Sequence, residues 1–482
     1  MDIVIANIRK QAKIDPDKTA LVIGNSHTSY RELVTRIENL ARIFIAKGIR
    51  PGERVVVAAP DKIAFVCAYF ATHLAGGTAV PINPHAPRER KKEIIDRTRP
   101  DLIVEASSEA NFLEATKTLC SSAFPALDEN DVADIMFTTG TTGRAKGVCL
   151  THSNIATAVS HINSVIGTRS TDIEVVPIPL YHSFGLGRIR CCLSNGATIV
   201  LVEGFRLPGE IFLALSRHEA TGFVGVPAGF SLLLRFGVNG LGRHGASLRY
   251  IEIGSAPMVE EDKNRLMALL PSAKLFMHYG LTEASRSSFI EFHRDSENLT
   301  SVGRPSPGVA IEVRDEKNTP CGPHQPGMLW ISGGHVSRGY WDDEELSLKT
   351  FLHGWVRTGD VGYFADDELL FLCGRADDMI NIGGYNVFPE EVESVLIKHP
   401  SIVDAACVGV DSSDAVTGQL LRAYLVAEPE EIHVGELELE NFLKDKLEPY
   451  KFPTEFRWVS KLPRTASGKL QRSKLRKSTS TT

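Results

Sequence analysis

Hydrophobic residues recur along the first third of the chain at the spacings of helices and buried strands. Ser29 and Glu32 have the spacing of a helix-capping box, and the apolar positions after them predict a helix with one buried face. These apolar positions are Leu33, Ile37, Leu40, Ala41 and Phe44. The pattern then predicts a buried strand over 54–59, a helix over 62–74 and a short strand that ends at Val80.

The same alternation of strand and helix lengths continues from residue 174 to residue 279. Short runs of apolar residues are separated by segments long enough to form a helix. The predicted strands are 175–178, 197–202, 222–226, 250–253 and 275–278. Because strand–helix alternation is typical of parallel sheets with helices on both faces, the predicted fold class is α/β with mostly parallel sheets.

The pattern changes at about residue 302. Short strands separated by Gly and Pro indicate a small antiparallel or barrel-like section over 302–373. After Gly374 the lengths of the predicted strands and helices change again, and we expect helices over 389–398 and 434–447. The sequence therefore predicts a large N-terminal domain over 1–374 and a smaller α+β C-terminal domain over 375–482.

Composition narrows the class of protein. The chain has 482 residues, of which 43% are hydrophobic and 23% are charged, as in soluble globular proteins of two or three domains. A net charge of −6 argues against a nucleic-acid partner, which would need a basic surface. The eight cysteines form no C-x-x-C pair and predict neither disulfides nor a zinc site. Since neither a secretory signal nor a membrane-spanning apolar run is found, we expect a cytoplasmic protein without an integral membrane segment.

The segment from Phe137 to Val148 carries the most informative chemical pattern. Its glycines let the backbone turn tightly and bring N–H groups toward an anion, its threonines add hydroxyl donors, and a lysine adds a positive charge. The residues expected to contact a polyphosphate are Thr138, Thr139, Gly140, Thr141, Thr142, Gly143 and Lys146. The segment is not a Walker A loop, because that motif would need Gly at Ala145 and Ser or Thr at Gly147. A strand is predicted after the lysine.

This loop resembles the phosphate loop of the AMP-forming, adenylate-forming superfamily, which contains acyl- and aryl-CoA synthetases, nonribosomal adenylation domains and luciferases. The family loop usually has Pro before the lysine, whereas this chain has Ala145. Further motifs follow in the family's order, and the resemblance extends from about Tyr30 to Arg472, closest to stand-alone acyl-CoA ligases. It implies ATP and Mg²⁺ as cofactors and a small C-terminal domain that moves during the reaction.

The segment Tyr279-Gly-Leu-Thr-Glu283 follows a predicted strand, at the edge where α/β sheets bind ligands. By the resemblance, the Tyr279 ring and Gly280 would lie against adenine, Thr282 would contact the α-phosphate and Glu283 would help to hold Mg²⁺. A carboxylate suits this role because Mg²⁺ prefers oxygen ligands. The residues that the resemblance assigns to the turn lining the adenine are Ser255, Ala256 and Pro257.

The predicted C-terminal domain and the strand before it carry further residues of the resemblance. Asp360, in a T-G-D triplet, would accept the ribose hydroxyls, and Arg375 would contact the ribose or the phosphates. Asp377 would be the hinge about which the C-terminal domain rotates. Lys469, in the closing signature, would reach the α-phosphate and the substrate carboxylate. Gly383 and Gly384 would let a slender pantetheine arm pass close to the backbone.

The implied chemistry has two half-reactions. A carboxylate attacks the α-phosphate of ATP to give an acyl-adenylate and pyrophosphate, and a thiol then displaces AMP. Positive groups around the phosphates offset the charge that develops there. The C-terminal domain would rotate between the two steps and withdraw Lys469.

The acid site is predicted after the strand over 175–178. His182 lies next to the substrate carboxylate in relatives, although a histidine of the core is the alternative reading. The other residues of the predicted acid pocket are Tyr181, Phe184, Val226, Pro227, Ala228 and Arg286. This lining is largely apolar and has no Asp or Glu between Pro177 and Asn195, so an aryl or fatty acid is favoured over an amino acid. Arg286 meets either a second polar group of the substrate or a surface carboxylate.

Three interpretations follow. The favoured one is an acid–thiol ligase that uses coenzyme A, because residues 381–393 resemble the form found in CoA ligases and no carrier domain follows. The second loads a stand-alone carrier protein through its phosphopantetheine arm. The third is a catalytically silent protein that binds ATP or an acyl-adenylate. The presence of Lys146, Glu283, Asp360 and Lys469 argues against the third.

Overall fold

The computed structural model describes residues 3–105, 123–138, 145–236, 240–382, 385–411, 419–427, 434–444, 446–464 and 470–477. The chain forms two compact units. The first contains residues 1–311 and 331–357, and the second contains residues 312–330 and 358–482. Within the described segments, no helix is long and apolar enough to cross a membrane.

The first unit contains a six-stranded sheet in the order β17–β7–β6–β4–β3–β5. The four strands from β6 to β5 run parallel, and β7 and β17 are antiparallel additions at one edge. Their bounds are β3 Arg54–Val57, β4 Thr78–Pro81, β5 Leu102–Val104, β6 Val132–Thr138, β7 Lys146–Thr151 and β17 Gly339–Tyr340. The β6–β7 pair places Thr138 opposite Lys146.

A second, nine-stranded sheet has the order β14–β13–β12–β11–β10–β8–β9–β1–β2. Its six central strands, from β12 to β1, are parallel, and antiparallel strands lie at both edges. Their bounds are β1 Thr19–Ile23, β2 Ser26–Ser29, β8 Ile173–Val176, β9 Thr198–Leu201, β10 Gly222–Gly225, β11 Tyr250–Ile253, β12 Lys274–Tyr279, β13 Ser288–Glu291 and β14 Arg304–Pro305.

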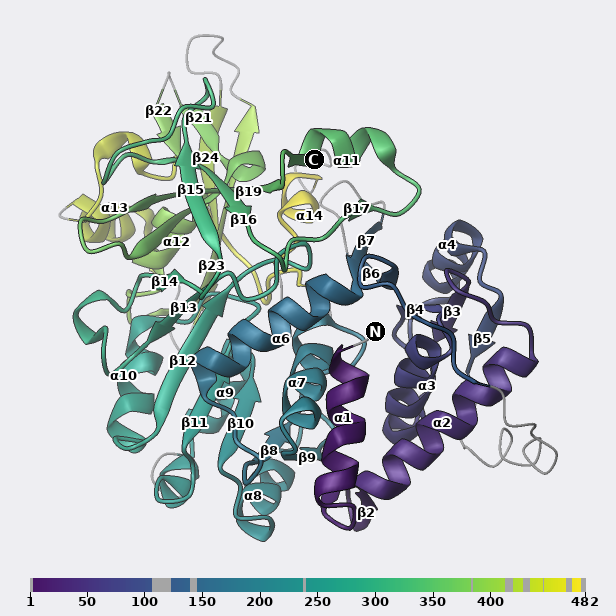
Figure 1. Cartoon of the computed structure of the whole chain (residues 1–482). Helices are drawn as coiled ribbons and strands as arrows, with labels where there is room; N and C mark the ends of the chain where they lie inside the picture. The colour runs from purple at the N-terminus through teal and green to yellow at the C-terminus, as the bar shows by residue number, and fades with distance from the viewer. Residues whose placement is uncertain are drawn as a thin grey trace. The chain divides into compact units, whose positions relative to one another are not determined.

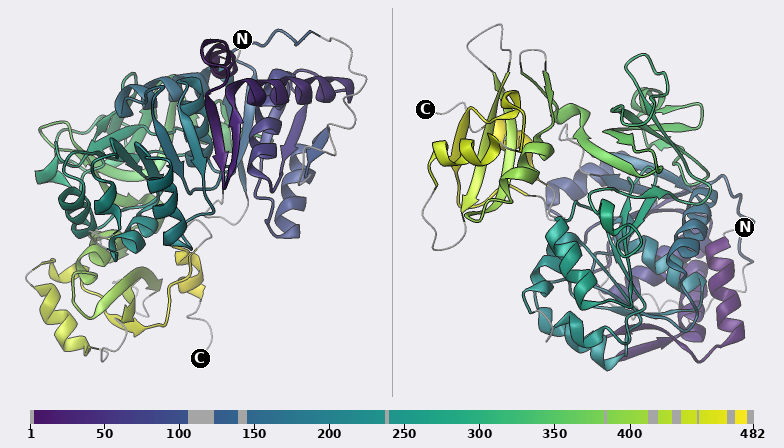
Figure 2. Two further views of the ribbon diagram at one scale, coloured as in Figure 1. Left: turned by 90° about the horizontal axis from the view of Figure 1, so that it is seen from below. Right: turned by 90° about the vertical axis from the view of Figure 1, so that its left-hand side faces the viewer.

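Five helices fill the space between the two sheets (Figures 1 and 2). They are α1 Ile3–Ile14, α2 Tyr30–Ala46, α3 Lys62–Leu74, α6 His152–Ile166 and α7 Ser183–Ser194. Alternate residues of one strand explain this layering: Val55 and Val57 face the central core with these helices, whereas Val56 faces a separate apolar cluster on the outer side. That outer side is covered by α4 Arg88–Thr98.

The outer face of the nine-stranded sheet packs on α8 Pro208–Arg217, α9 Pro227–Leu234 and α10 Glu260–Leu269. A separate sheet follows in the order β15–β16–β19–β18, with β20 paired to β19. The pairs β18–β19 and β19–β20 are antiparallel. The bounds in this part are β15 Ala310–Arg314, β16 Gly327–Ser332, α11 Glu344–Thr350, β18 Phe351–Leu352, β19 Trp355–Phe364 and β20 Leu370–Arg375. Short 3₁₀ helices cover 241–244 and 296–298.

The rest of the second unit has its own core around a three-stranded sheet, β23–β24–β25, and a hairpin, β21–β22. The strands are β21 Ile380–Ile382, β22 Tyr385–Val387, β23 Ile402–Asp411, β24 Gln419–Ala427 and β25 Glu455–Trp458. The helices are α12 Pro389–Leu396, α13 Glu436–Lys444 and α14 Arg472–Lys477, with 3₁₀ turns at 376–378 and 449–451.

The predicted α/β class with mostly parallel sheets is confirmed. The Ser29 capping box begins α2 as predicted, and all five apolar positions of that helix are buried. Most of the β15–β16–β19–β18 sheet lies in the section over 302–373, which was predicted to be antiparallel or barrel-like. Its strand order is that of an open sheet. The predicted domain boundary at residue 374 differs from the division into compact units, which assigns 312–330 and 358–374 to the second unit.

A buried ion pair and two hydrogen-bonding side chains connect β6 with the helices α3 and α7. Asp134, which is fully buried, accepts from the Tyr69 hydroxyl at 3.2 Å, lies 2.9 Å from His73 Nε2 and pairs with Arg190 of α7. Burial raises the pKa of the Asp134 carboxyl, but Arg190 and His73 outweigh burial and leave it below its ordinary value. The strand that leads into the phosphate loop is therefore fixed to α3 and α7 by charge.

We expect Asp134→Asn to lower the stability of the protein by about 3 kcal/mol or more, because it leaves the buried Arg190 without a counter-charge. The midpoint of thermal unfolding measures this loss. The matched control is Glu345→Gln, which breaks the exposed Lys349–Glu345 pair and should leave the midpoint nearly unchanged. Equal midpoints for wild type and Asp134→Asn would show that this pair does not hold the strand.

Candidate active site

The carboxyl ends of four neighbouring parallel strands form the centre of the site. The strands β8, β10, β11 and β12 lie side by side, so the segments that follow them emerge at one edge of the nine-stranded sheet. Ligands of α/β folds bind at this edge. The segments that follow are 177–184, 226–228, 254–257 and 280–286, and they contain most of the predicted site residues.

The predicted adenine turn follows β11. Ser255 has φ +77°, in the left-handed region that favours glycine, and its side chain is exposed. Such strain is typical of binding sites, because the surrounding structure must hold it. Gly254 has no room for a side chain, since a Cβ atom there would lie 2.1 Å from the His278 ring. Ala256 is half-buried and Pro257 is exposed, and Tyr279 ends β12 as a buried side chain.

The predicted acid pocket lies at the starts of α7 and α9. His182 is the exposed residue before α7, and its ring is 4.7 Å from the Tyr181 ring. Burial raises the pKa of the Tyr181 hydroxyl. Tyr181 and Val226 pack against the central core, to which Phe184 belongs. Pro227 is buried and Ala228 is exposed at the start of α9. These residues thus follow β8 and β10, two neighbouring parallel strands of the sheet.

The phosphate loop is described at its two ends only. Thr138 closes β6 and Lys146 opens β7, in register with each other, and β7 confirms the strand predicted after the lysine. The predicted residues Thr139, Gly140, Thr141, Thr142 and Gly143 lie outside the described residues.

Tyr340 connects this loop with the predicted metal ligand. Its hydroxyl donates to Glu283 Oε1 at 2.7 Å, and the Lys146 ammonium lies 5.6 Å from the centre of its ring. Tyr340 reaches this position because β17 pairs with β7, opposite Val148. The Ser337 N–H also donates to the Glu283 carbonyl at 2.8 Å. A lysine from one sheet and a carboxylate from the other are therefore held against one side chain.

Two buried histidines support the turn after Glu283. His161 of α6 contacts the Ser285 carbonyl at 3.2 Å, and His335 contacts the Ser287 hydroxyl at 3.0 Å. The two rings lie edge to face with their centres 5.0 Å apart. Burial lowers the pKa of His161 to about 4 and that of His335 to about 3, so both rings are neutral near pH 7. A cavity of about 20 Å³ is lined in part by His335 and Thr282.

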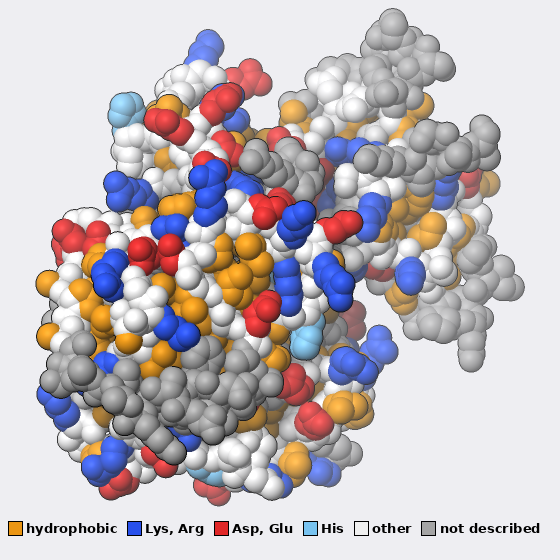
Figure 3. Space-filling view, turned by 90° about the vertical axis from the view of Figure 1, so that its right-hand side faces the viewer, with side chains coloured by type: hydrophobic (Ala, Val, Ile, Leu, Met, Phe, Trp, Pro, Cys, Tyr) orange, Lys and Arg blue, Asp and Glu red, His pale blue; other side chains and the backbone are white. Residues whose placement is uncertain are grey.

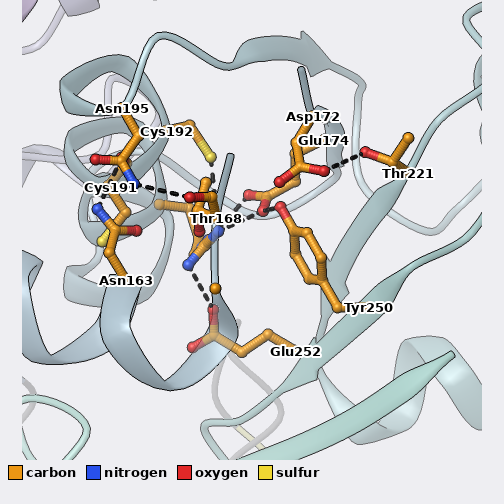
Figure 4. Close-up of polar contacts among 12 residues, drawn as sticks. Asn163, Thr168, Asp172, Glu174, Cys191, Cys192, Asn195, Thr221, Tyr250 and Glu252 are labelled. Atoms are coloured by element: carbon orange, nitrogen blue, oxygen red, sulfur yellow. Dashed lines mark hydrogen bonds and ion pairs between the residues drawn. The ribbon is translucent and has the colours of Figure 1, made fainter. Parts of the chain in front are cut away.

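A buried cluster of charges lies directly behind the site; we call it the Glu252 cluster. Arg188 of α7 donates to Glu174 of β8 from two nitrogens, at 2.9 and 2.5 Å, and lies 3.3 Å from Glu252 of β11. Figure 4 shows both carboxylates joined by dashed lines to one guanidinium group. Glu252 Oε1 also lies 3.0 Å from Arg286 Nε and 2.9 Å from His278 Nδ1. All five side chains are at least nine-tenths buried.

The charges of this cluster balance. Burial alone would raise the pKa of the Glu252 carboxyl, but Arg286, Arg188 and His278 together lower it well below its ordinary value. Burial lowers the pKa of His278. Two carboxylates therefore face two guanidinium groups and a neutral imidazole.

Arg286 differs from both alternatives drawn from the sequence. Besides the contact with Glu252, its guanidinium donates to the carbonyls of Ser183 and Phe184 and to the Ser285 hydroxyl. It is 2% exposed, so the carboxylate that it meets is a buried one and not a surface group. All of these contacts of the guanidinium are with protein atoms. They therefore give no support to the hypothesis that Arg286 binds a second group of the substrate.

The second unit carries the remaining predicted residues. Arg375 Nη1 donates to Asp360 Oδ1 at 2.7 Å, and the two residues face each other in the β19–β20 register. Asp377 is exposed in the 3₁₀ turn after β20. Gly383, Gly384 and Lys469 lie outside the described residues.

Several residues of the site were missed by sequence reasoning, among them Tyr340, His335, His161, His278 and Glu252. They occur singly in the sequence, without a motif spacing that suggests chemistry. Only the pairing of β17 with β7 and the order of the parallel strands bring them to the site.

Comparison with known proteins agrees with this geometry. The model of the AMP-binding enzyme family matches residues 8–341, and the model of the AMP-binding enzyme C-terminal domain matches residues 391–469. The chain therefore belongs to the AMP-binding enzyme family, and the predicted membership in the adenylate-forming superfamily is confirmed.

The curated relatives include CoA ligases. The chain is 30% identical to 2-succinylbenzoate–CoA ligase of Bacillus licheniformis, over 97% of this chain and 98% of that one. It is 29% identical to feruloyl-CoA synthase of an Amycolatopsis species, over 97% of each. Among solved structures, it is similar to o-succinylbenzoate CoA synthetase of Bacillus subtilis in complex with the acyl-adenylate intermediate, with a TM-score of 0.87, 26% identity and 97% of each chain covered.

The histidine pair predicts a pH dependence of stability. In the unfolded chain both rings titrate near pH 6.5. As the pH falls from about 6.5 toward 4, the unfolded chain takes up protons that the folded chain does not, so stability falls. Replacing His335→Gln removes one of these titrations, and the thermal midpoint should then fall less between pH 7 and pH 5 than in wild type. His85→Gln, at an exposed position, is the control. An unchanged pH profile in His335→Gln would contradict the assignment.

Proposed function

We propose that this protein joins a carboxylic acid to coenzyme A in two steps. The carboxylate attacks the α-phosphate of ATP, which gives an acyl-adenylate and releases pyrophosphate, and the CoA thiol then displaces AMP. The observation that carries the proposal is the contact of Tyr340 with both Glu283, the carboxylate proposed for the metal, and Lys146, the lysine proposed for the phosphates. The names of the relatives, which are CoA ligases, support the choice of acceptor.

The residues present suit the ATP–Mg²⁺ complex. Glu283 offers a hard carboxylate, of which Tyr340 binds one oxygen, and the other oxygen would bind the cation. Bound Mg²⁺ would neutralise phosphate charge. Lys146 and the hydroxyls of Thr138 and Thr282 would hold the phosphate oxygens in line for attack, so that catalysis depends on positioning and electrostatics. The solved Bacillus subtilis enzyme has also been observed with ATP and a magnesium ion.

Residues of the second unit complete the proposal. Asp360 would accept the ribose hydroxyls, and the 2.7 Å contact with Arg375 orients its carboxylate. Lys469 would bring a positive charge to the α-phosphate in the first half-reaction, and rotation about Asp377 would withdraw it before the thiol enters past Gly383 and Gly384.

The substrate class that we propose is an aryl or fatty acid, with an aryl acid preferred. Tyr181, Phe184 and Val226 offer an apolar wall beside His182. An amino acid would need a carboxylate for its ammonium group. The two buried carboxylates behind the pocket, Glu174 and Glu252, are already paired with arginines. The aryl acids in the names of the relatives fit this wall.

A stand-alone carrier protein is the alternative acceptor, because its phosphopantetheine arm presents the same thiol as coenzyme A. A cytoplasmic location remains a prediction, and so does the absence of a nucleic-acid partner.

Acid-dependent exchange of pyrophosphate into ATP, without CoA, tests the first half-reaction. We expect exchange with aryl or fatty acids, no exchange with amino acids, and a loss of at least about 100-fold in Lys146→Met, in line with the removal of a preorganised charge. Lys274→Met, at an exposed position, is the matched control. Exchange that is absent with every acid of the panel, or that prefers amino acids, would contradict the proposal. Adding CoA or a carrier protein then identifies the acceptor.

Tyr340→Phe tests the bridge between Lys146 and Glu283. Loss of a hydrogen bond to a charged group costs about 1.5–3 kcal/mol, so we expect exchange to fall about 10- to 100-fold and the Mg²⁺ concentration for half-maximal rate to change. Tyr363→Phe removes a hydroxyl from a residue of β19 that stacks on Phe371, and should leave the rate unchanged. Wild-type exchange and Mg²⁺ dependence in Tyr340→Phe would show that the bridge has no catalytic value.

A further inference from the structure

One face of α4 contacts both described ends of the phosphate loop. Arg90, Glu93 and Arg97 are spaced three and four residues apart, so they lie on one face of the helix. Arg90 Nη2 donates to the Thr138 carbonyl at 3.2 Å, and the Ala145 N–H donates to Glu93 Oε1 at 3.1 Å. Arg97 donates to the Ala145 carbonyl. On the side of the molecule shown in Figure 3, where α4 lies, basic and acidic side chains are interspersed.

Glu93 is itself held in place. Arg90 Nη1 lies 2.7 Å from Glu93 Oε2, so one oxygen of the carboxylate binds Arg90 and the other binds Ala145. Burial raises the pKa of the Glu93 carboxyl, but the Ala145 N–H and the two arginines outweigh burial and leave it lowered. The carboxylate is therefore charged at neutral pH and oriented toward the backbone of the loop's end.

Arg97 is fixed from the other side. Its Nη2 donates to the Trp341 carbonyl at 3.2 Å, and the Trp341 indole N–H donates to the Arg97 carbonyl at 3.1 Å. The Trp341 N–H donates to the Gly147 carbonyl at 2.7 Å, next to Lys146. Arg97 also lies 5.5 Å from the centre of the Phe137 ring, next to Thr138. Both ends of the loop are thus tied to one rigid helix.

We propose that Arg90, Glu93 and Arg97 form a clamp that positions Thr138 and Lys146 for the phosphates of ATP, with Glu93 as its central positioning residue. The inference rests on the proposed function, because it assigns the clamp to the ATP site. It also accounts for Ala145, where the resemblance leads one to expect proline. Proline restricts the backbone but has no N–H. Ala145 supplies an N–H, and Glu93 uses it to provide the restraint that the proline ring would otherwise give.

The clamp acts on a defined part of the ligand. Thr138 and Lys146 belong to the loop proposed for the polyphosphate, whereas Tyr279 and the 254–257 turn are proposed for the adenine. Loosening the clamp should therefore weaken the binding of ATP and leave the binding of AMP nearly unchanged. A general loss of structure would weaken both ligands.

The test measures the dissociation constants of ATP and AMP for a set of variants by titration calorimetry, together with the KM for ATP in the exchange assay. We expect Glu93→Ala to raise both ATP constants about tenfold, with AMP affinity within twofold of wild type. Glu93→Gln, which keeps an acceptor for the Ala145 N–H, should recover most of the loss. Glu89→Ala, at an exposed position in the first turn of α4, is the control.

The variant Ala145→Pro separates the mechanism from simple damage to the helix. Proline removes the N–H that Glu93 accepts, so Glu93→Ala should have much less effect in the Ala145→Pro background than alone. Additive effects of the two changes, or equal losses for ATP and AMP in Glu93→Ala, would overturn the clamp. If Ala145→Pro fails to fold, the comparison of Glu93→Gln with Glu93→Ala still decides.

The experiments distinguish failure of the proposed ligase function from failure of the clamp. If wild type binds ATP but no acid supports exchange, the ligase proposal fails while the dissociation constants still test the clamp. If wild type does not bind ATP at all, both proposals are wrong.

Discussion

The Glu252 carboxylate is the constraint on which the site depends. Its oxygens contact three side chains from other parts of the chain: Arg188 of α7, His278 of β12, and Arg286 in the segment after β12. Glu252 itself lies two residues before Gly254, where the turn begins. A buried charge is tolerated only with its partners in place. The loops that carry the acid pocket, the adenine turn and the Glu283 segment are therefore held in one arrangement by a single set of matched charges.

The two sheets contribute different halves of the chemistry. The six-stranded sheet carries the proposed phosphate loop between β6 and β7, and the nine-stranded sheet carries the strand ends proposed to hold the acid and the adenine. Among the described residues, Tyr340 connects them: its hydroxyl donates to Glu283, and the Lys146 ammonium lies over its ring. Acyl transfer through an adenylate needs a positive environment for phosphate beside a pocket for an acid, and this connection brings the two together.

Local patterns predicted those parts of the fold and site that depend on short stretches of chain. The capping box at Ser29, the helix over 62–74 and the strand after Lys146 are determined within a dozen residues, and the structure has all three. The adenine and phosphate segments could be proposed because their residues are adjacent in sequence. The family comparison confirms the membership that those segments suggested.

The remaining features depend on contacts between residues that are far apart in the sequence, which local patterns cannot predict. Glu93 and Ala145 are 52 residues apart, and Tyr340 and Glu283 are 57 apart. The partner of Arg286 could not be predicted for the same reason: Glu252 lies on another strand, and a buried carboxylate looks like any other acidic residue in the sequence. Burial and register decide such contacts, and both arise only when the sheets assemble.

The most direct test of the central claim follows one oxygen atom through the reaction. If the acid's carboxylate attacks the α-phosphate and a thiol then displaces AMP, an acid labelled with ¹⁸O in its carboxylate must leave one labelled oxygen in the AMP. The measurement is the mass of AMP after one turnover with an aryl acid, ATP, Mg²⁺ and CoA. One ¹⁸O in AMP is the result that the account predicts. Label in inorganic phosphate, or AMP without label beside the thioester, would contradict it.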